Sequence, residues 1–210
     1  RRVLFRSKQL AEEGAAEAQY NLALMYSLGK EIPKDDQIAI KWYRLAAEQG
    51  FAEAQNNLGL IYGKGQGVEQ NFGEAVKWYR LAAEQGHKQA RFNLGIMYYL
   101  GEGIQKNSKE AAKCFNLAAE QGHKEAQCNL GIMYYKGTGV EKDHRKALKW
   151  FQHSADLGDT LAQYNLGVLY TNGRGVPKND KRAVEWYKKS AEQGFANAQS
   201  NLGFMYAEGR

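Results

Sequence analysis

Apolar residues between positions 50 and 85 recur at intervals of three and four, which is the spacing of one face of an α-helix. The first stripe consists of Ala54, Leu58, Ile61 and Tyr62. The second stripe consists of Ala75, Trp78, Tyr79, Ala82 and Ala83. Glycines and polar residues separate the two stripes, so this segment predicts two amphipathic helices joined by a turn.

The same pattern returns every 36 residues without insertion or deletion, and 21 of the 23 glycines fall on four series with this period. A fixed period of this size is typical of a solenoid. Complete repeats are predicted at 14–49, 50–85, 86–121, 122–157 and 158–193. Residues 8–13 match the end of a preceding repeat, residues 194–210 begin a sixth repeat, and residues 1–7 do not match.

Short polar residues and glycines mark the expected helix ends. An Asp or Asn, the preferred N-cap types, precedes every second helix, at Asp35, Asn71, Asn107, Asp143 and Asn179. Glycines such as Gly65 and Gly50 follow the helices, and the mid-helix series of Gly59 predicts close approach of a neighbouring helix. One hairpin cannot bury both stripes, so neighbours must supply the core. The sequence predicts an all-α fold, a right-handed α-solenoid of stacked helix–turn–helix repeats.

These residues resemble a known family. The segments Ala126–Tyr134, Gly137–Val140 and Ala147–Phe151, with the closing Gly158, are similar to the Sel1-like repeat, a relative of the tetratricopeptide repeat. The resemblance covers residues 8–210. It implies a non-catalytic adaptor or scaffold that assembles protein complexes, with a peptide or protein partner held in the concave groove of the solenoid.

By analogy with tetratricopeptide repeats, the groove is lined by the side of the first helix that lies opposite its core stripe. The expected groove residues are Tyr20, Asn56, Phe92, Tyr99, Tyr135 and Tyr164. Exposed aromatic side chains in a groove favour peptide binding, although these rings could instead pack between adjacent first helices.

An asparagine recurs at one position of every first helix. Possible secondary groove contacts are Asn57, Asn93, Asn129 and Asn165. The alternative is a repeated hydrogen bond to a neighbouring turn, which the recurrence of the asparagine in every repeat favours.

Charge and hydropathy exclude two classes of partner. The formal net charge is +6, but Arg1, Arg2, Arg6 and Lys8 supply most of it, and charges of both signs alternate along the rest of the chain. Nucleic-acid binding requires clustered Lys and Arg along one face, so it is not expected. No stretch approaches the roughly 18–20 apolar residues of a membrane-spanning helix, so direct membrane insertion is not expected either.

Candidate chemistry was sought in glycine loops, histidines and cysteines. The Gly65–Gln66–Gly67 loop follows a helix and lacks the Lys-Ser/Thr of a phosphate loop, so it is interpreted as a turn. The four histidines are expected on the surface, and neither a metal nor a cofactor is predicted. No nucleophile has an adjacent base in any recurring pattern, so no enzymatic activity is expected.

The two cysteines bear on the alternative function. A disulfide between Cys114 and Cys128 is geometrically open, but Cys114 replaces a packed Trp, which favours a buried thiol. A cysteine-rich branch of the family, credited with binding or hydrolysing β-lactams, carries a regular cysteine pair in each repeat. This chain lacks that pattern, so the alternative of a β-lactam-binding or hydrolysing enzyme is disfavoured.

The ends of the repeat array predict self-association. Neither end carries a polar capping helix, so the apolar stripes of the partial repeats are expected to be exposed. We therefore expect end-to-end association of the 210-residue chain.

Overall fold

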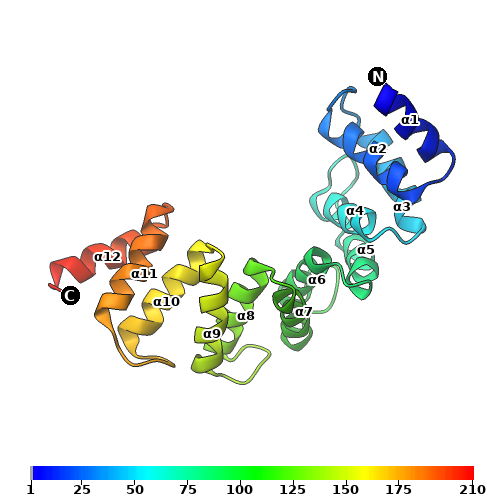
Figure 1. Cartoon of the computed structure of the whole chain (residues 1–210). Coiled ribbons are helices and arrows are strands. Elements are labelled where there is room, and N and C mark those ends of the chain that lie inside the picture. Colours follow the sequence, from blue (N-terminus) through cyan, green and yellow to red (C-terminus); the bar gives the residue numbers. More distant parts are fainter. Residues whose placement is uncertain (1) are drawn as a thin grey trace. The chain divides into compact units, whose positions relative to one another are not determined.

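The computed structural model describes residues 2–210, and side chains from residue 6 onward. The described residues form twelve α-helices and no strand (Figure 1). The helices are α1 (Arg2–Glu12), α2 (Ala16–Leu28), α3 (Asp36–Glu48), α4 (Ala52–Lys64), α5 (Phe72–Glu84), α6 (Lys88–Leu100), α7 (Ser108–Glu120), α8 (Lys124–Lys136), α9 (His144–Asp156), α10 (Thr160–Asn172), α11 (Asp180–Glu192) and α12 (Ala196–Ala207). The predicted all-α class of repeated helix–turn–helix units is therefore confirmed.

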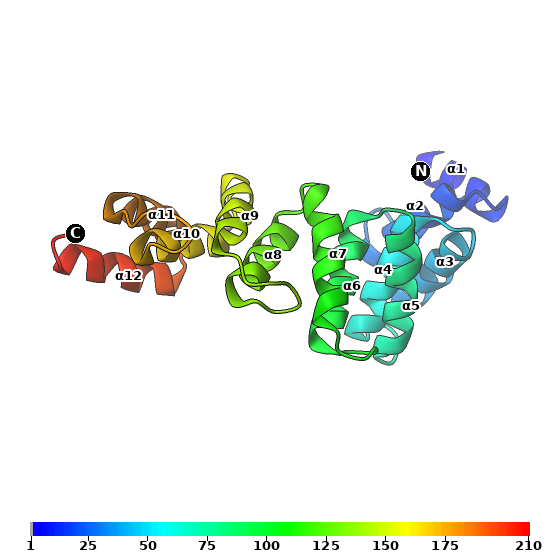
Figure 2. The same ribbon diagram turned by 90° about the horizontal axis from the view of Figure 1, so that it is seen from below.

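The chain divides into two compact parts, residues 1–106 and residues 107–210. Within each part, every helix packs against the next one along the chain (Figures 1 and 2). Helices of about 13 residues are marginal on their own in water, so packing between neighbours must supply most of their stability.

Buried side chains from neighbouring helices form the cores. In residues 1–106, Leu58 and Ile61 of α4 join Tyr43 and Ala46 of α3 in one cluster. In residues 107–210, Phe151 of α9 and Leu166 of α10 form a similar cluster. Full burial of a Leu or Phe side chain contributes about 1.5–3 kcal/mol, so a few such contacts outweigh the weak intrinsic stability of each short helix.

A recurring glutamine joins first helices to the preceding second helix, and in α6 Arg91 makes the same bond to Ala83. The Nε2 of Gln55 donates to the carbonyl of Ala47 at 3.0 Å, and Gln127 and Gln163 make the same bond to Ala119 and Ala155 at 3.1 and 3.4 Å. These bonds satisfy carbonyls at the ends of second helices, which have no partner within the helix.

The predicted caps of the second helices are confirmed. The carboxylate or amide oxygen of every predicted N-cap accepts a backbone N–H of the first helical turn, for example Asp35 from Ile38 at 2.9 Å. The glycines that end the first helices α2, α4, α6, α8 and α10 are left-handed, as predicted.

The expectation of surface histidines is wrong for His123, which is only 7% exposed. His87 and His123 are N-caps of the first helices α6 and α8, and their Nδ1 atoms accept the N–H of Ala90 and Ala126 at 3.2 and 3.3 Å. The imidazole of His123 replaces the short oxygen side chain of an ordinary cap and lies against the helix start, which explains its burial.

The two cysteines do not form a disulfide. Cys114 is half-buried, so the expectation of a buried thiol at this position is wrong, whereas Cys128 is buried. Cys114 is smaller than the Trp that occupies this position in the other repeats, so it fills less of the space between the helices.

Stability should depend on pH through the His87 cap. Its Nδ1 accepts a hydrogen bond and burial holds the pKa of His87 below its ordinary value, while Glu53 partly opposes this shift. The unfolded chain therefore binds the proton at a higher pH, and the free energy of unfolding should fall as pH drops from 7 to 5.5. A His87→Asn variant keeps a capping group without titration, so its urea-unfolding free energy should lose about 0.5 kcal/mol less over this range. Equal losses in both proteins would contradict the assignment.

Candidate functional site

Two predicted groove residues lie in matching aromatic trios, one in each part of the chain. The ring of Tyr20 in α2 lies 5.9 Å from Tyr43 and 5.1 Å from Phe51. The ring of Tyr164 in α10 lies 5.9 Å from Tyr187 and 5.2 Å from Phe195. Tyr20 and Tyr164 are both half-buried, so each packs between helices and still presents part of its ring to solvent.

Asparagines of the following first helix complete these trios. Asn57 hydrogen-bonds the hydroxyls of Tyr20 and Tyr43, and burial is the main cause that raises the pKa of both phenols. Tyr187 is bonded in the same way to Asn201 and to Thr171, whose Oγ1 lies 3.2 Å from the phenol oxygen. At these positions the asparagine bonds tyrosine hydroxyls inside the protein, not the neighbouring turn that was expected.

Asn56 and Asn93 also bond to each other within the protein. Asn56 is 5% exposed, and its Oδ1 accepts from the Nδ2 of Asn93 at 3.1 Å. The Oδ1 of Asn93 accepts from Gln89 at 3.1 Å. This pairing joins α4 to α6 and leaves Asn56 little surface for a partner.

Asn129 and Asn165 are half-buried, and the two differ from the other asparagines in their neighbours. The Nδ2 of Asn165 is buried and has no hydrogen-bond partner. Phe151 stands where Tyr43 and Tyr187 stand in other repeats, so the hydroxyl that bonds Asn57 and Asn201 is missing here.

The remaining groove candidates lie on the first helices α6 and α8. Phe92 and Tyr99 are half-buried in α6, within residues 1–106. Tyr135 is half-buried at the end of α8, within residues 107–210, and its hydroxyl accepts from Arg174. Sequence reasoning missed Arg174, and a comparison of the loops would not have distinguished it, because Lys30 and Arg210 are also basic at this position.

A hollow of about 320 Å³ lies between α10 and α12. It is lined by Tyr164, Val168, Thr171, Asn172, Tyr187, Asn201, Phe204 and Met205. A larger hollow of about 570 Å³ lies between α7 and α8 but contains none of the predicted groove residues. The α10–α12 hollow combines aromatic walls with a hydroxyl and two amides, the mixture that gives a peptide site both contact area and orientation.

The reactivity of Cys128 and the grouping of possible metal ligands bear on the chemistry of the described residues. Burial, and then the neighbouring Asp159, raise the pKa of the Cys128 thiol, so the thiol stays protonated and is a poor nucleophile. From residue 6 onward, no three His, Cys, Asp or Glu side chains come together as metal ligands would. Among the described helices, none has both the length and the apolar character needed to cross a membrane.

The profile of the Sel1 repeat matches residues 16–51, 52–87, 88–123, 124–159, 160–195 and 196–210. No curated protein matches the chain. Solved structures include a protective antigen of uropathogenic Escherichia coli that displays an SLR fold. It is 42% identical with a TM-score of 0.95, and the match covers 98% of this chain and 44% of that one.

A second similar structure is a Sel1 repeat protein from Oxalobacter formigenes. It is 42% identical with a TM-score of 0.86, and the match covers 94% of this chain and 78% of that one. The present chain thus spans less than half of the E. coli antigen and more than three quarters of the Oxalobacter protein. With six matched repeats over residues 16–210 and these neighbours, the chain belongs to the Sel1 repeat family.

Proposed function

We propose that this chain is a non-catalytic interaction scaffold that binds a peptide or protein segment on the face of its first helices. Sel1 repeat proteins are commonly protein-interaction scaffolds, and the fold is typically non-enzymatic. The observation that carries the proposal is the hollow between α10 and α12, which is lined by the predicted groove residue Tyr164. No feature of the described residues favours the β-lactam alternative.

The proposed contacts differ in how much surface they can offer. Tyr164, Tyr135, Tyr99, Phe92 and Tyr20 are half-buried and can contact a partner with part of each ring. Asn57 bonds the hydroxyls of Tyr20 and Tyr43, so its proposed role is to fix these rings, whereas Asn56 and Asn93 bond to each other inside the protein.

Filling the hollow should block binding without unfolding the chain. Asn172 lines the hollow and is exposed, so tryptophan can replace it without entering the core. Peptides selected from a displayed random library on the wild-type chain should bind Asn172→Trp about tenfold more weakly, as expected when a contact at the centre of an interface is lost. Fluorescence anisotropy of the labelled peptides measures the change.

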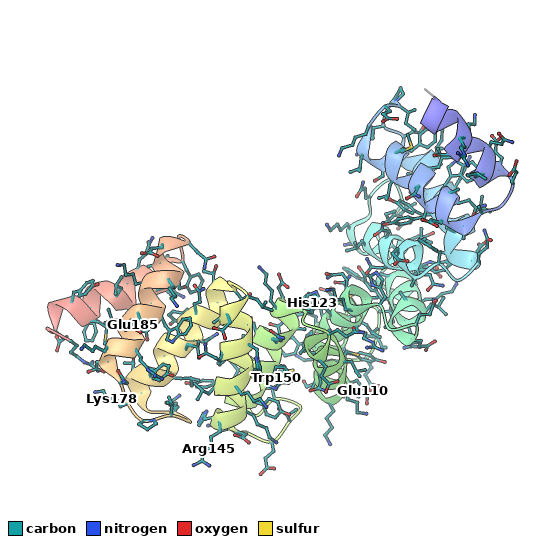
Figure 3. The ribbon with its side chains drawn as sticks, viewed as in Figure 1. Glu110, His123, Arg145, Trp150, Lys178 and Glu185 are labelled. Atoms are coloured by element: carbon teal, nitrogen blue, oxygen red, sulfur yellow. The ribbon has the colours of Figure 1, made fainter. Side chains whose placement is uncertain are left out.

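The matched control is Glu185→Trp, on the exposed face of α11 and outside the hollow (Figure 3). This variant should bind the selected peptides like the wild type, with unchanged helicity by circular dichroism. Unchanged affinity of the Asn172→Trp variant for every selected peptide would refute the groove.

We also propose that the 210-residue chain self-associates through α12, where Phe204 and Tyr206 are 59% and 60% exposed. Exposed aromatic side chains of this size on one helix favour contact with a second apolar surface. Sedimentation velocity at the concentrations of the binding assay separates this association from peptide binding.

A further inference from the structure

Each loop that follows a first helix lies against the start of an earlier second helix. A Cβ added to Gly67 would lie 2.9 Å from the Cβ of Asp36, the first residue of α3. In residues 107–210, a Cβ on Gly139 would overlap the carbonyl of Ser108, and one on Gly175 would overlap the carbonyl of His144. The loops and the second-helix starts therefore form one continuous edge within each part.

The residue after the first loop glycine can contact the first residue of that second helix, 30 positions earlier. The Nε2 of Gln66 donates to the Oδ1 of Asp36 at 3.3 Å. Arg210 donates to both carboxylate oxygens of Asp180, at 2.6 and 2.8 Å. This position therefore pairs a donor with a carboxylate in two places of the same chain.

The corresponding pair of Arg174 and His144 has no carboxylate. Arg174 donates to the hydroxyl of Tyr135, and its guanidinium carbon lies 5.4 Å from the centre of the Tyr135 ring. The ring of His144 lies 5.1 Å from the same tyrosine ring, and its buried Nδ1 has no hydrogen-bond partner. Three polar groups thus meet around Tyr135 without the carboxylate that Asp36 and Asp180 supply in two other repeats.

Lys142 adds a further positive charge to this group. After burial, Lys142 and Arg174 are the main causes that lower the pKa of His144. Asp143 opposes them, but its carboxylate accepts the N–H groups of Arg145 and Lys146 at 2.9 and 3.0 Å. In the part of the chain that the structure describes, neither Arg174 nor Lys142 has a carboxylate within ion-pair distance.

We propose that Lys142, His144, Arg174 and the Tyr135 hydroxyl form a binding site for a carboxylate of an acidic polypeptide segment. We call this site the loop cluster. It rests on the proposed function, since it supposes that the partner is a protein. The bidentate Arg210–Asp180 pair shows the group that an arginine binds at this position, and the planar guanidinium matches a carboxylate.

The surroundings of the loop cluster favour an acidic peptide over a nucleic acid. Arg174 is exposed, and Figure 3 shows Arg145 and Lys178 along the same edge of residues 107–210. Residues 107–210 contain 15 basic and 11 acidic residues, so the positive charge is local and does not form an extended phosphate-binding stripe.

The decisive variant is His144→Asp, which supplies the missing acid from within the chain. Asp36 and Asp180 occupy the same position in other repeats, so the fold accepts aspartate here. The new carboxylate should pair with Arg174, raise the urea midpoint of unfolding and remove the site for an external carboxylate. Binding is then lost in a protein that is more stable, which separates loss of the site from unfolding.

The probes are a fluorescein-labelled, capped 12-residue peptide of alternating Glu and Ser, and its counterpart with Gln in place of Glu. The wild-type chain should bind the Glu peptide about fivefold more tightly at low salt, as expected for exposed charge pairs. Arg174→Gln and His144→Asp should lose this preference, whereas Glu185→Trp, which lies outside the loop cluster, should keep it.

Several results would overturn the loop cluster. One is equal binding of the two peptides by the wild type, and another is an undiminished preference in His144→Asp. A third is tighter, Arg174-dependent binding of a 12-nucleotide single-stranded DNA. Asn172→Trp tests the groove separately. If this variant keeps the preference for the Glu peptide, the loop cluster is supported, even where the selected peptides show that the groove proposal has failed.

Discussion

Replacing Gly167 with alanine is expected to lower the free energy of unfolding by about 2 kcal/mol, although alanine is the better helix former. Gly167 lies in the middle of α10, where a Cβ would lie 2.5 Å from the Cδ1 and Cε1 of Tyr187. That ring is buried and bonded through its hydroxyl to Thr171 and Asn201, so it cannot move aside without losing these contacts. Overpacking of this kind outweighs the gain in helix propensity.

Gly203 provides a matched control because it occupies the same repeat position in α12. A Cβ on Gly203 would meet nothing within 4 Å. Gly203→Ala should therefore raise the free energy of unfolding by about 0.5–1 kcal/mol, the ordinary gain from glycine to alanine in a helix. Urea unfolding followed by circular dichroism measures both variants, and changes of the same sign would contradict the packing account.

The sequence predicted the parts of the fold that depend on local chemistry. Asp35 and Asn71 were predicted as N-caps from residue type and spacing, and each accepts a first-turn N–H. The close approach expected at Gly59 is confirmed, since a Cβ there would lie 2.5 Å from the ring of Tyr79. Such features recur in each repeat because the same neighbours recur.

Two kinds of feature were missed, an unusual cap type and a contact that depends on another repeat. His87 and His123 were not expected as caps because histidine is not among the preferred N-cap residues. Arg174 was not singled out, since its meaning depends on a residue 30 positions earlier being His144 rather than aspartate. No local motif carries that information.

The aromatic residues at the expected groove positions also depend on neighbours that a local sequence pattern does not show. Ser27 and Thr171 leave space for the hydroxyls of Tyr43 and Tyr187, which they hydrogen-bond. In α8 the larger Tyr135 occupies this position and packs against the core cluster that contains Phe151, which has no hydroxyl. The residue type at this groove position therefore depends on whether the second helix carries Tyr or Phe beside it. Variation of this position between repeats does not by itself indicate a binding role.

The second large effect is expected at Gly175, in the loop that carries Arg174. Gly175 has a φ of +72°, and a Cβ there would overlap the backbone carbonyl of His144 and lie 2.9 Å from the N of Arg145. A backbone obstacle cannot rotate away as a side chain can, and the left-handed conformation adds about 1 kcal/mol for alanine. We expect Gly175→Ala to lower the free energy of unfolding by about 3 kcal/mol in urea denaturation.

Gly158→Ala separates the two causes, because Gly158 has a φ of +82° and a Cβ there would meet nothing within 4 Å. It should cost only about 1 kcal/mol, the left-handed contribution alone. Amide hydrogen exchange should show that Gly175→Ala weakens protection first at the start of α9 and the end of α10, where the loop separates from its support. Equal losses of stability in the two variants would mean that the loop does not depend on its contact with His144, and the continuous edge would then lose its physical basis.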